Sequence, residues 1–357
     1  HANLITVNRR QAVVLVNNKN QYVIVLYGLR AKHFKRLDEH IIEAIKQTLR
    51  KEYIKDEIVE QFITHSSEVI FSKTKSRSLI AKMNNVCKNI NYYGDLLKED
   101  DIYSPEVSKK LSRVMVGSSV KDYIIPSEEM FNDLERFAGG STFKCEAVEL
   151  KVRLDLEKFN VWRKLVIPLD MTFGDLHKTI QSAFGWYGYH LHEYYLYSQY
   201  SGNLSINHPG YHKKRYKPFL NIVSDKEAFE FGDDDIKMKL EEDIRLADYI
   251  PTDIVDQDEQ DYPKIKYIYD FGDYWQHYIE IERIVEDYEG NYPMCTAGEG
   301  DTPPEDVGGK IGYERFRQII EDKSHPEHEK MVIWGETQGY EEFNFEEINK
   351  DIKHKFT

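Results

Sequence analysis

Residues 269 to 309 read YDFGDYWQHYIEIERIVEDYEGNYPMCTAGEGDTPPEDVGG, and this stretch says most about the fold. Its first half has β-branched and aromatic residues on both sides of Asp270-Phe271-Gly272-Asp273, a combination typical of two strands joined by a turn. Its second half, from Cys295 to Gly309, is rich in acids, glycine and proline, which is typical of a loop. We therefore expect a hairpin over Lys264 to Ile284, followed by an acidic loop.

The segments ahead of this hairpin predict two paired strands and a helix. Apolar and charged residues alternate strictly from Val148 to Leu156, which is the pattern of a half-buried strand, and Val161 to Ile167 is expected to pair with it. Thr172 followed by Asp175 has the spacing of a helix-capping box, and Gly185 is suited to end that helix. The buried stripe of the helix is expected to be Phe173, Leu176, Ile180 and Phe184.

A strand over His190 to Tyr197 completes the elements expected in this half of the chain. We predict an α+β fold whose mainly antiparallel sheet has its helices packed on one side, and a ubiquitin-like core is one form that such a sheet can take. In the first half, Ala12 to Val16 and Tyr22 to Tyr27 are expected to form a hairpin. The helices expected there are Leu37 to Leu49, Asp56 to Ile63, Ser78 to Lys88 and Pro105 to Met115.

Length and composition favour two globular domains. The chain has 357 residues, where a domain usually has about 150, and its hydrophobic content of 41% is enough for each domain to bury a core. The sequence Phe137-Ala138-Gly139-Gly140-Ser141 is the best linker, so we place the domains at 1 to 138 and 142 to 357. No apolar run approaches the roughly 20 residues of a membrane span, and the three cysteines form no Cys-x-x-Cys pair. We therefore expect reduced thiols, a cytoplasmic location and no membrane partner.

The second half of the chain carries motifs of a known family. Trp162-Arg163 leads into an apolar run that ends at Pro168, and matching motifs follow in the same order at His190 to Tyr194, Tyr269 to His277 and Phe343 to Asn349. Over about 148 to 352 the chain resembles the plasmid pRiA4b Orf-three-like family, whose members are carried by plasmids and insertion sequences, some under the passenger name TnpR.

The family has no established activity, so the resemblance places the chain without giving its chemistry. Val307 stands where the family usually has a cysteine, which argues against a two-cysteine metal site in that loop. Residues 1 to 138 resemble an uncharacterised domain that is sometimes found ahead of the family domain.

Charge divides the two halves. Residues 1 to 140 carry 22 Lys and Arg against 18 acids, and the rest carries 26 against 44, which gives the formal net charge of −14. An acidic domain is unsuited to sequence-independent binding of nucleic acid, so the first domain, with Arg9-Arg10 and Lys32 to Arg36, is the candidate for that role. In the second domain, a basic run suits phosphate binding and base stacking, although the flanking Pro209-Gly210 is more typical of a surface loop. That run includes Lys213, Lys214, Arg215 and Tyr216.

Histidines and acids give a candidate metal site. On one strand, His190 and His192 would lie on the same face about 7 Å apart. Asp270 or Asp273 from the turn would complete a divalent-metal site, with Glu193 as the general base of a metal-dependent hydrolase. The alternative is that the histidines belong to the core, where we expect His277 to be hydrogen-bonded. We predict no cofactor, with a divalent metal as the alternative.

The loop acids give a candidate interaction site. Glu299, Asp301, Glu305 and Asp306 suit a protein partner with a basic surface, and the 25 tyrosines suit a polar interface. Alternatively, Pro304 begins a helical turn whose dipole Glu305 and Asp306 complement. We predict an accessory protein of a mobile element that acts as a non-catalytic protein-interaction module through an acidic, tyrosine-rich face. The alternatives are a metal-dependent hydrolase and a DNA-binding accessory protein of transposition.

Overall fold

The computed structural model describes residues 1–66, 69–73, 76–98, 101–117, 123–198, 218–232, 235–252 and 262–357. They form two compact units, each with its own sheet and its own core. The first comprises His1–Lys144, Glu289–Asn291 and Thr357, and the second comprises Cys145–Tyr288 and Tyr292–Phe356. Among the described residues, no helix combines the length and the apolar composition that a bilayer crossing requires.

The first unit is built on a three-stranded antiparallel sheet of β1 (Ala2–Val7), β2 (Arg10–Val16) and β3 (Val23–Leu29). The predicted hairpin is confirmed as β2 and β3. The four predicted helices are also confirmed, and β1, α1, η1 and α6 are additions. The helical elements are α1 (Ala31–Phe34), α2 (Leu37–Lys51), α3 (Asp56–His65), α4 (Arg77–Asn89), η1 (Ile90–Leu96), α5 (Pro105–Ser112) and α6 (Pro126–Ala138).

Helices cover both faces of this sheet because successive strand residues point to opposite sides. Ile24 and Leu26 pack with α2, α3 and α6, whereas Val23 and Val25 pack with α4 and α5. The edge strand β3 is covered by α5. Its backbone N–H groups at Val23 and Val25 donate to the Oγ atoms of Ser112 and Ser108, both at 2.9 Å. An edge whose donors are satisfied in this way is not open to pairing with another strand.

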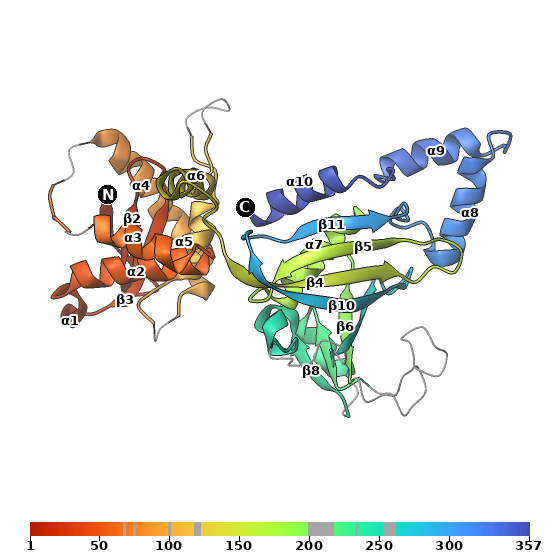
Figure 1. Ribbon diagram of the computed structural model, residues 1–357, viewed down its shortest axis with the longest axis horizontal. Helices are drawn as coiled ribbons and strands as arrows, with labels where there is room; N and C mark the ends of the chain where they lie inside the picture. Colours follow the sequence, from red (N-terminus) through yellow and green to blue (C-terminus); the bar gives the residue numbers. More distant parts are fainter. Residues whose placement is uncertain are drawn as a thin grey trace. The chain divides into compact units, whose positions relative to one another are not determined.

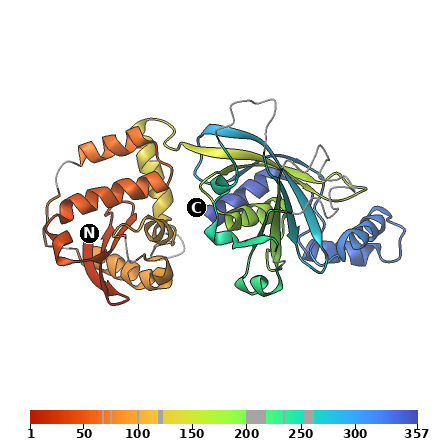
Figure 2. The same cartoon turned by 90° about the horizontal axis from the view of Figure 1, so that it is seen from below.

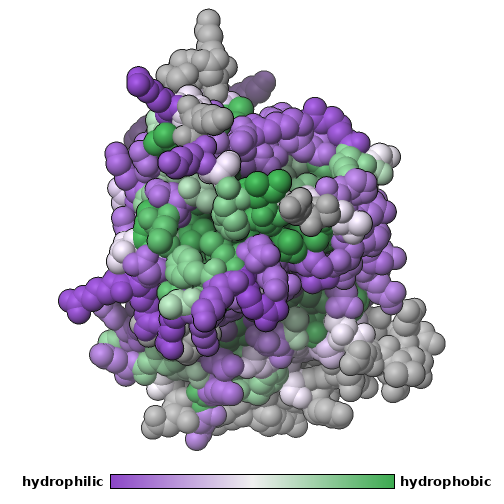
Figure 3. Space-filling view, turned by 90° about the vertical axis from the view of Figure 1, so that its left-hand side faces the viewer, coloured by the Kyte–Doolittle hydropathy of each residue, from purple (hydrophilic) through white to green (hydrophobic). Residues whose placement is uncertain are grey.

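The first unit also has an apolar hollow on its surface. Figure 3 faces this unit and shows apolar residues gathered in a depression among polar ones. A cavity of about 780 Å³ in the unit is lined by residues of β1, β2, β3, α2, α3 and α6 and by the segment 69–73. Its apolar lining includes Leu15, Ile24, Ile41, Ile45, Leu49, Phe62, Val69, Ile70, Phe71 and Met130.

The second unit has a sheet of eight strands among the described residues, in the order β11-β5-β4-β10-β9-β6-β7-β8. Neighbouring strands are antiparallel except β7 and β8. The strands are β4 (Cys145–Leu154), β5 (Trp162–Pro168), β6 (His192–Tyr197), β7 (Leu220–Val223), β8 (Lys237–Leu240), β9 (Lys264–Tyr269), β10 (Trp275–Tyr288) and β11 (Met294–Glu299). The helical elements are α7 (Phe173–Phe184), η2 (Lys226–Phe231), η3 (Glu241–Asp243), η4 (Leu246–Asp248), α8 (Gly309–Glu321), α9 (His328–Thr337) and α10 (Phe345–Phe356).

The predicted α+β class is confirmed, and a ubiquitin-like core is not. In Figures 1 and 2, α7 and α10 lie together on one face of the sheet, with α8 and α9 at one end. The predicted pairing of the strands around Val148 and Val161 and the hairpin around Gly272 are also confirmed. Two boundaries were wrong. β6 begins at His192 rather than at His190, and the predicted loop from Cys295 begins inside β11, which pairs with β5.

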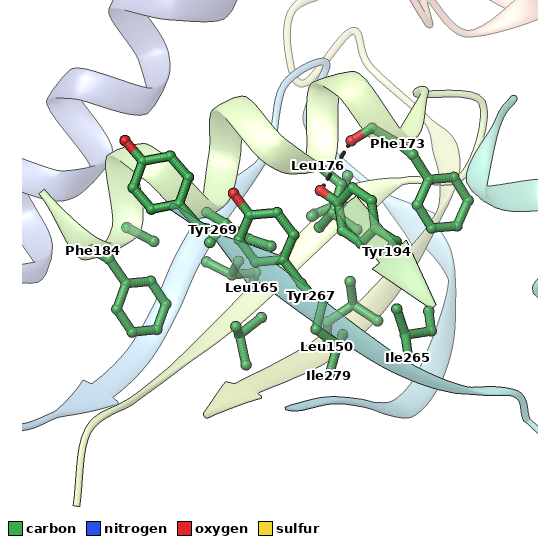
Figure 4. Close-up of a cluster of buried hydrophobic side chains, with 14 of the residues drawn as sticks. Leu150, Leu165, Phe173, Leu176, Phe184, Tyr194, Ile265, Tyr267, Tyr269 and Ile279 are labelled. Carbon is green, nitrogen blue, oxygen red and sulfur yellow. Dashed lines mark hydrogen bonds between the residues drawn. The ribbon is translucent and has the colours of Figure 1, made fainter. Parts of the chain in front are cut away.

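Helix α7 forms for the reasons that its sequence predicts. Thr172 Oγ1 accepts from the backbone of Asp175 at 3.1 Å, and the Asp175 carboxylate accepts from the backbone of Thr172 at 3.2 Å. Gly185 ends the helix with a left-handed φ of 68°. The predicted stripe is buried against the sheet (Figure 4), where Tyr194, Tyr267 and Tyr269 lie in a row under the helix.

A buried arginine connects the strands with α7. Arg163 on β5 is only 2% exposed and has no carboxylate partner among the described residues. Its guanidinium donates to the carbonyls of Ala183, Glu299 and Gly300 at 2.8 to 3.0 Å. It also donates to the carbonyl of Trp162 and the hydroxyl of Thr302. Burial lowers its pKa to about 10, so it stays protonated at neutral pH.

We expect Arg163→Lys to destabilise the second unit by about 3 kcal/mol, because an ammonium group cannot reach all five acceptors and leaves buried carbonyls unpaired. Urea unfolding followed by tryptophan fluorescence measures this unit, since all four tryptophans belong to it. The control is Arg315→Lys, the same change at an exposed position. Equal unfolding midpoints for the two variants would contradict the role given to Arg163.

Candidate functional site

Three segments meet beside the turn between β9 and β10. They are residues 186–191 after α7, the turn 270–274 itself, and residues 303–308 before α8. The indole Nε1 of Trp186 donates to the carbonyl of Pro303 at 2.8 Å, and the backbone of Asp270 donates to the carbonyl of Leu191 at 3.0 Å. The backbone of Gly308 donates to Asp273 Oδ2 at 3.1 Å. These bonds hold the three segments in contact.

The turn fixes the carboxylate of Asp270. Asp270 has a φ of 56°, a left-handed conformation that aspartate tolerates better than most residues. Its Oδ1 accepts from the backbone of Gly272 at 2.8 Å, and its carbonyl accepts from the backbone of Tyr274 at 2.6 Å. A Cβ at Gly272 would lie 3.2 Å from Asp270 Oδ1, so a glycine suits this position. Asp270 Oδ2 is left facing His190.

His190, Asp270 and Asp306 form a close group, which we call the triad. His190 Nε2 lies 3.7 Å from Asp270 Oδ2 and 3.4 Å from Asp306 Oδ1, and all three atoms lie within 4.8 Å of one another. Asp270 is 8% exposed, and the side chain of Asp306 is 56% exposed. The second oxygen of Asp306 accepts from the Tyr189 hydroxyl at 3.0 Å. The triad is therefore anchored on one side and open to solvent on the other.

The metal set predicted from the sequence is divided by the fold. His190 and Asp270 come together, but His192 points into the core, where its Nε2 lies 2.7 Å from Glu241 Oε2 and its ring stacks on His177. The expectation that both histidines share one face of a strand was wrong, because His190 precedes β6. Asp273 is bound to the backbone of Gly308 and is not part of the triad.

The acids predicted to bind a partner mostly serve the loop itself. Glu299 Oε2 accepts from Asn160 Nδ2 and Trp162 Nε1 at 2.8 and 3.1 Å. Asp301 accepts from the backbone of Phe343 at 3.2 Å and pairs with Arg317 at 3.3 Å.

Glu305 is 2% exposed and accepts from the backbone of Tyr187 at 3.0 Å and from the Tyr269 hydroxyl at 2.8 Å. The prediction that Glu305 belongs to a surface for a partner was therefore wrong, and of the four acids Glu299 and Asp306 are exposed. Nor does Pro304 begin a helical turn. Gly308 adopts a left-handed conformation, and α8 begins at Gly309.

A pocket of about 730 Å³ opens next to the triad, bounded by β6, β7, η2 and the 270–274 turn. Leu191 and Phe271 line this pocket, and they directly follow His190 and Asp270 in the sequence. Leu191 is 58% exposed and Phe271 is 50% exposed. Glu193, predicted as a general base, lines this pocket and accepts from Asn221 Nδ2 at 3.1 Å. Glu193 is not one of the triad, so the structure does not place it as the base of a metal-bound water there.

The nucleic-acid predictions concern a basic run of the second domain and basic residues of the first. Lys213, Lys214, Arg215 and Tyr216 lie outside the described residues. In the first unit, Arg36 pairs with Glu39 three residues later, as a solvated helix-start residue often does.

Two buried histidines were only partly foreseen. His277 lies buried in the core as predicted, and the backbone groups of Trp275 and Tyr267 interact with its ring. His177, on α7, was not singled out from the sequence. Its Nδ1 lies 2.8 Å from the Tyr267 hydroxyl, which also accepts from Gln181. Burial lowers the pKa of His177 to about 2 and that of His277 to about 3.

Asp306 and Glu241 could not be matched with their histidine partners from the sequence. Asp306 was recognised as an acid but not as a partner of His190, from which it is 116 positions distant. Glu241, the partner of His192, lies in a short helical turn with two further acids, where it resembles a solvated charge.

The family model for plasmid pRiA4b ORF-3-like proteins matches residues 146–351, more than half of the chain. This chain belongs to that family. Residues 1–129 match a model for a domain of unknown function, DUF6933. A relative, the uncharacterised protein y4hQ of Sinorhizobium fredii, is 30% identical over 210 residues, which cover 58% of this chain and 91% of that protein.

A solved structure to which the chain is similar is that of a protein of unknown function from Methanosarcina mazei. It is 30% identical, and the match covers 59% of this chain and 99% of that one with a TM-score of 0.43. The names of these relatives assign no activity, so a function for this member of the family has to be argued from its own residues.

We expect the second unit to lose stability as the pH falls below about 6.5, because His177 and His277 are held neutral in the fold and become protonated on unfolding. The contribution of each neutral histidine to the free energy of unfolding is fully present above the unfolded-state pKa. About 2 kcal/mol of it per histidine should be lost between pH 7 and pH 5. Urea unfolding at several pH values tests this. His277→Leu should reduce the pH dependence, whereas His354→Leu, at an exposed site, should not. An unchanged pH dependence in His277→Leu would refute the assignment.

Proposed function

We propose that this family member is a binding module whose second unit holds a basic side chain of a protein partner in the pocket beside the 270–274 turn. The observation that carries the proposal is the composition of the pocket. Its described lining residues include acids and aromatic rings but no Lys or Arg. The acids are Glu193, Asp225 and Glu227, and the aromatic residues are Tyr195, Phe231, Phe271 and Tyr274.

Such a lining suits an organic cation. A guanidinium or ammonium group gains from carboxylates and from the faces of aromatic rings, and it gains more where water is partly excluded. Phe271 and Tyr274 are about half exposed at the rim, so their rings are available to a ligand. The aliphatic part of a Lys or Arg side chain would lie against the apolar residues Val223 and Met238.

The carboxylate of Glu193 is the anchor in this proposal. It is held by the neutral amide of Asn221, and no Lys or Arg of the described residues lies within ion-pair distance of it. Burial and the nearby Glu193 charge raise the pKa of Tyr195, so that residue stays a neutral phenol. Lys266 is influenced by Glu193 through space, and burial lowers its pKa. Because the described lining has three acids and no Lys or Arg, a cationic ligand would balance part of the negative charge of the pocket.

This proposal moves the interaction site from the loop acids to the pocket and keeps the basic partner that the sequence suggested. An accessory role in a mobile element is part of the same proposal, supported by the plasmid origin in the family name. Hydrolysis with Glu193 as the base is not favoured, since Glu193 and the triad are separate groups.

We expect a peptide with a central Arg to bind at least about 10-fold more tightly than the same peptide with citrulline, its neutral analogue. Fluorescence anisotropy with the full chain measures both. Glu193→Gln should remove the preference for Arg. The matched control is Glu329→Gln, an exposed acid on α9 that does not line the pocket. Equal affinities for the two peptides, or a preference that survives Glu193→Gln, would rule the proposal out.

A further inference from the structure

We propose that the triad of His190, Asp270 and Asp306 binds one divalent ion of the first transition series. This site is separate from the pocket and does not depend on the proposed function. It combines one imidazole nitrogen with two carboxylate oxygens, brought together from three segments of the chain. Nothing in the names of its relatives assigns a metal to this family member.

The distances fit an ion with little movement. Metal–ligand bonds to histidine nitrogen and to carboxylate oxygen are about 2.0 to 2.2 Å, so two ligand atoms on one ion lie about 3 to 3.5 Å apart. The separations from His190 Nε2 are 3.4 Å to Asp306 Oδ1 and 3.7 Å to Asp270 Oδ2. The two carboxylate oxygens lie within 4.8 Å of each other, and Asp306, the most exposed of the three side chains, is the ligand that can move to bring them closer.

Each carboxylate of the triad is already oriented by its other oxygen. Asp270 Oδ1 accepts from the backbone of Gly272, which leaves Oδ2 facing His190. Asp306 Oδ2 accepts from the Tyr189 hydroxyl, which leaves Oδ1 facing the same nitrogen. Partners of this kind fix the direction of metal ligands, and they are a regular part of metal sites.

The surroundings have an excess of negative charge that no protein cation balances. The carboxylates of Asp270, Asp273, Glu305 and Asp306 belong to the two loops that meet here. Among the described residues, none of the four has a Lys or Arg within ion-pair distance, and His190 is the one basic group beside Asp270 and Asp306. Like charges this close are unfavourable unless a cation lies among them.

Two buried polar atoms are also left without a hydrogen-bond partner. One is Nε2 of His190, the nitrogen that faces both triad carboxylates. The other is Oε2 of Glu305, a residue outside the triad. Glu305 is only 2% exposed. Glu305 and Asp306 both interact with the hydroxyl of Tyr189, so the Glu305 carboxylate lies near the residue that orients Asp306. Unpaired buried polar atoms are costly, and a bound ion with its waters would satisfy them.

The ligand set indicates the type of ion. Imidazole with two carboxylates suits Zn²⁺, Mn²⁺ or Fe²⁺, whereas Mg²⁺ and Ca²⁺ prefer oxygen ligands alone and in larger number. Three protein ligands leave coordination positions free on the solvent side, where Asp306 is exposed. The ion would therefore be open to water or to a ligand group.

Isothermal titration of the chelator-treated full chain with Zn²⁺, Mn²⁺ and Mg²⁺ tests the site. We expect one ion per chain, with affinity decreasing in that order. His190→Ala and Asp270→Asn should each weaken Zn²⁺ binding at least about 30-fold. The control is Asp273→Asn, which changes an acid of the same turn outside the triad and should weaken binding no more than about 3-fold.

Visible absorption of bound Co²⁺ gives a second readout, because the spectrum reports coordination by nitrogen and should change in His190→Ala. Tryptophan fluorescence confirms that each variant is folded. Absence of Zn²⁺ binding in the folded wild-type chain overturns the proposal. So does Zn²⁺ binding that persists in His190→Ala and Asp270→Asn. Glu193→Gln should keep its metal affinity, so failure of the pocket proposal and failure of this one can be distinguished.

Discussion

The guanidinium of Arg163 joins its own strand, β5, to two parts of the second unit that are distant from it in sequence. It donates to the last turn of α7, to the end of β11 and to the loop that follows β11. Because all its acceptors are neutral, its position is set by hydrogen-bond directions rather than by an opposite charge. The rings of Phe184 and Phe343 lie 5.1 and 4.2 Å from its central carbon and close the space around it. Gly298 is required nearby, since a Cβ there would lie 2.9 Å from the arginine side chain.

The candidate site depends on this arrangement. Residues 186–191 begin where α7 ends, and residues 303–308 begin just after the loop that Arg163 binds. His190 belongs to the first of these segments, and Asp306 belongs to the second. The row of tyrosines under α7 gives further support, because the Tyr269 hydroxyl binds Glu305 and the Tyr267 hydroxyl binds His177 and Gln181. Polar groups in a core reduce stability but restrict how a helix can lie on a sheet, because each has few partners within reach.

Local sequence patterns were sufficient to predict the helices and strands that have a strong hydrophobic periodicity or a clear helix cap. Helix α7 was predictable from its capping box, its apolar stripe and Gly185, and β4 from its alternation. Strand β11 was not, because Met294 to Glu299 includes a glycine and an acid and pairs with β5 across an irregular register. The triad was not predictable as a group. Its members come from three loops, and no spacing in the sequence reports that Asp306 lies beside His190.

The pocket and the triad share the turn between β9 and β10, and this connects the two proposals physically. Asp270 belongs to the triad, whereas Phe271 and Tyr274 line the pocket. Both Asp270 and Tyr274 have left-handed backbone conformations, so the turn has little freedom to change one side without the other. On the other side of the turn, Leu191 lines the pocket and accepts from the backbone of Asp270. An ion that fixed Asp270 would also restrict Phe271. The turn would then lose less conformational entropy when a ligand binds in the pocket. By thermodynamic linkage, a ligand in the pocket would strengthen ion binding by the same factor.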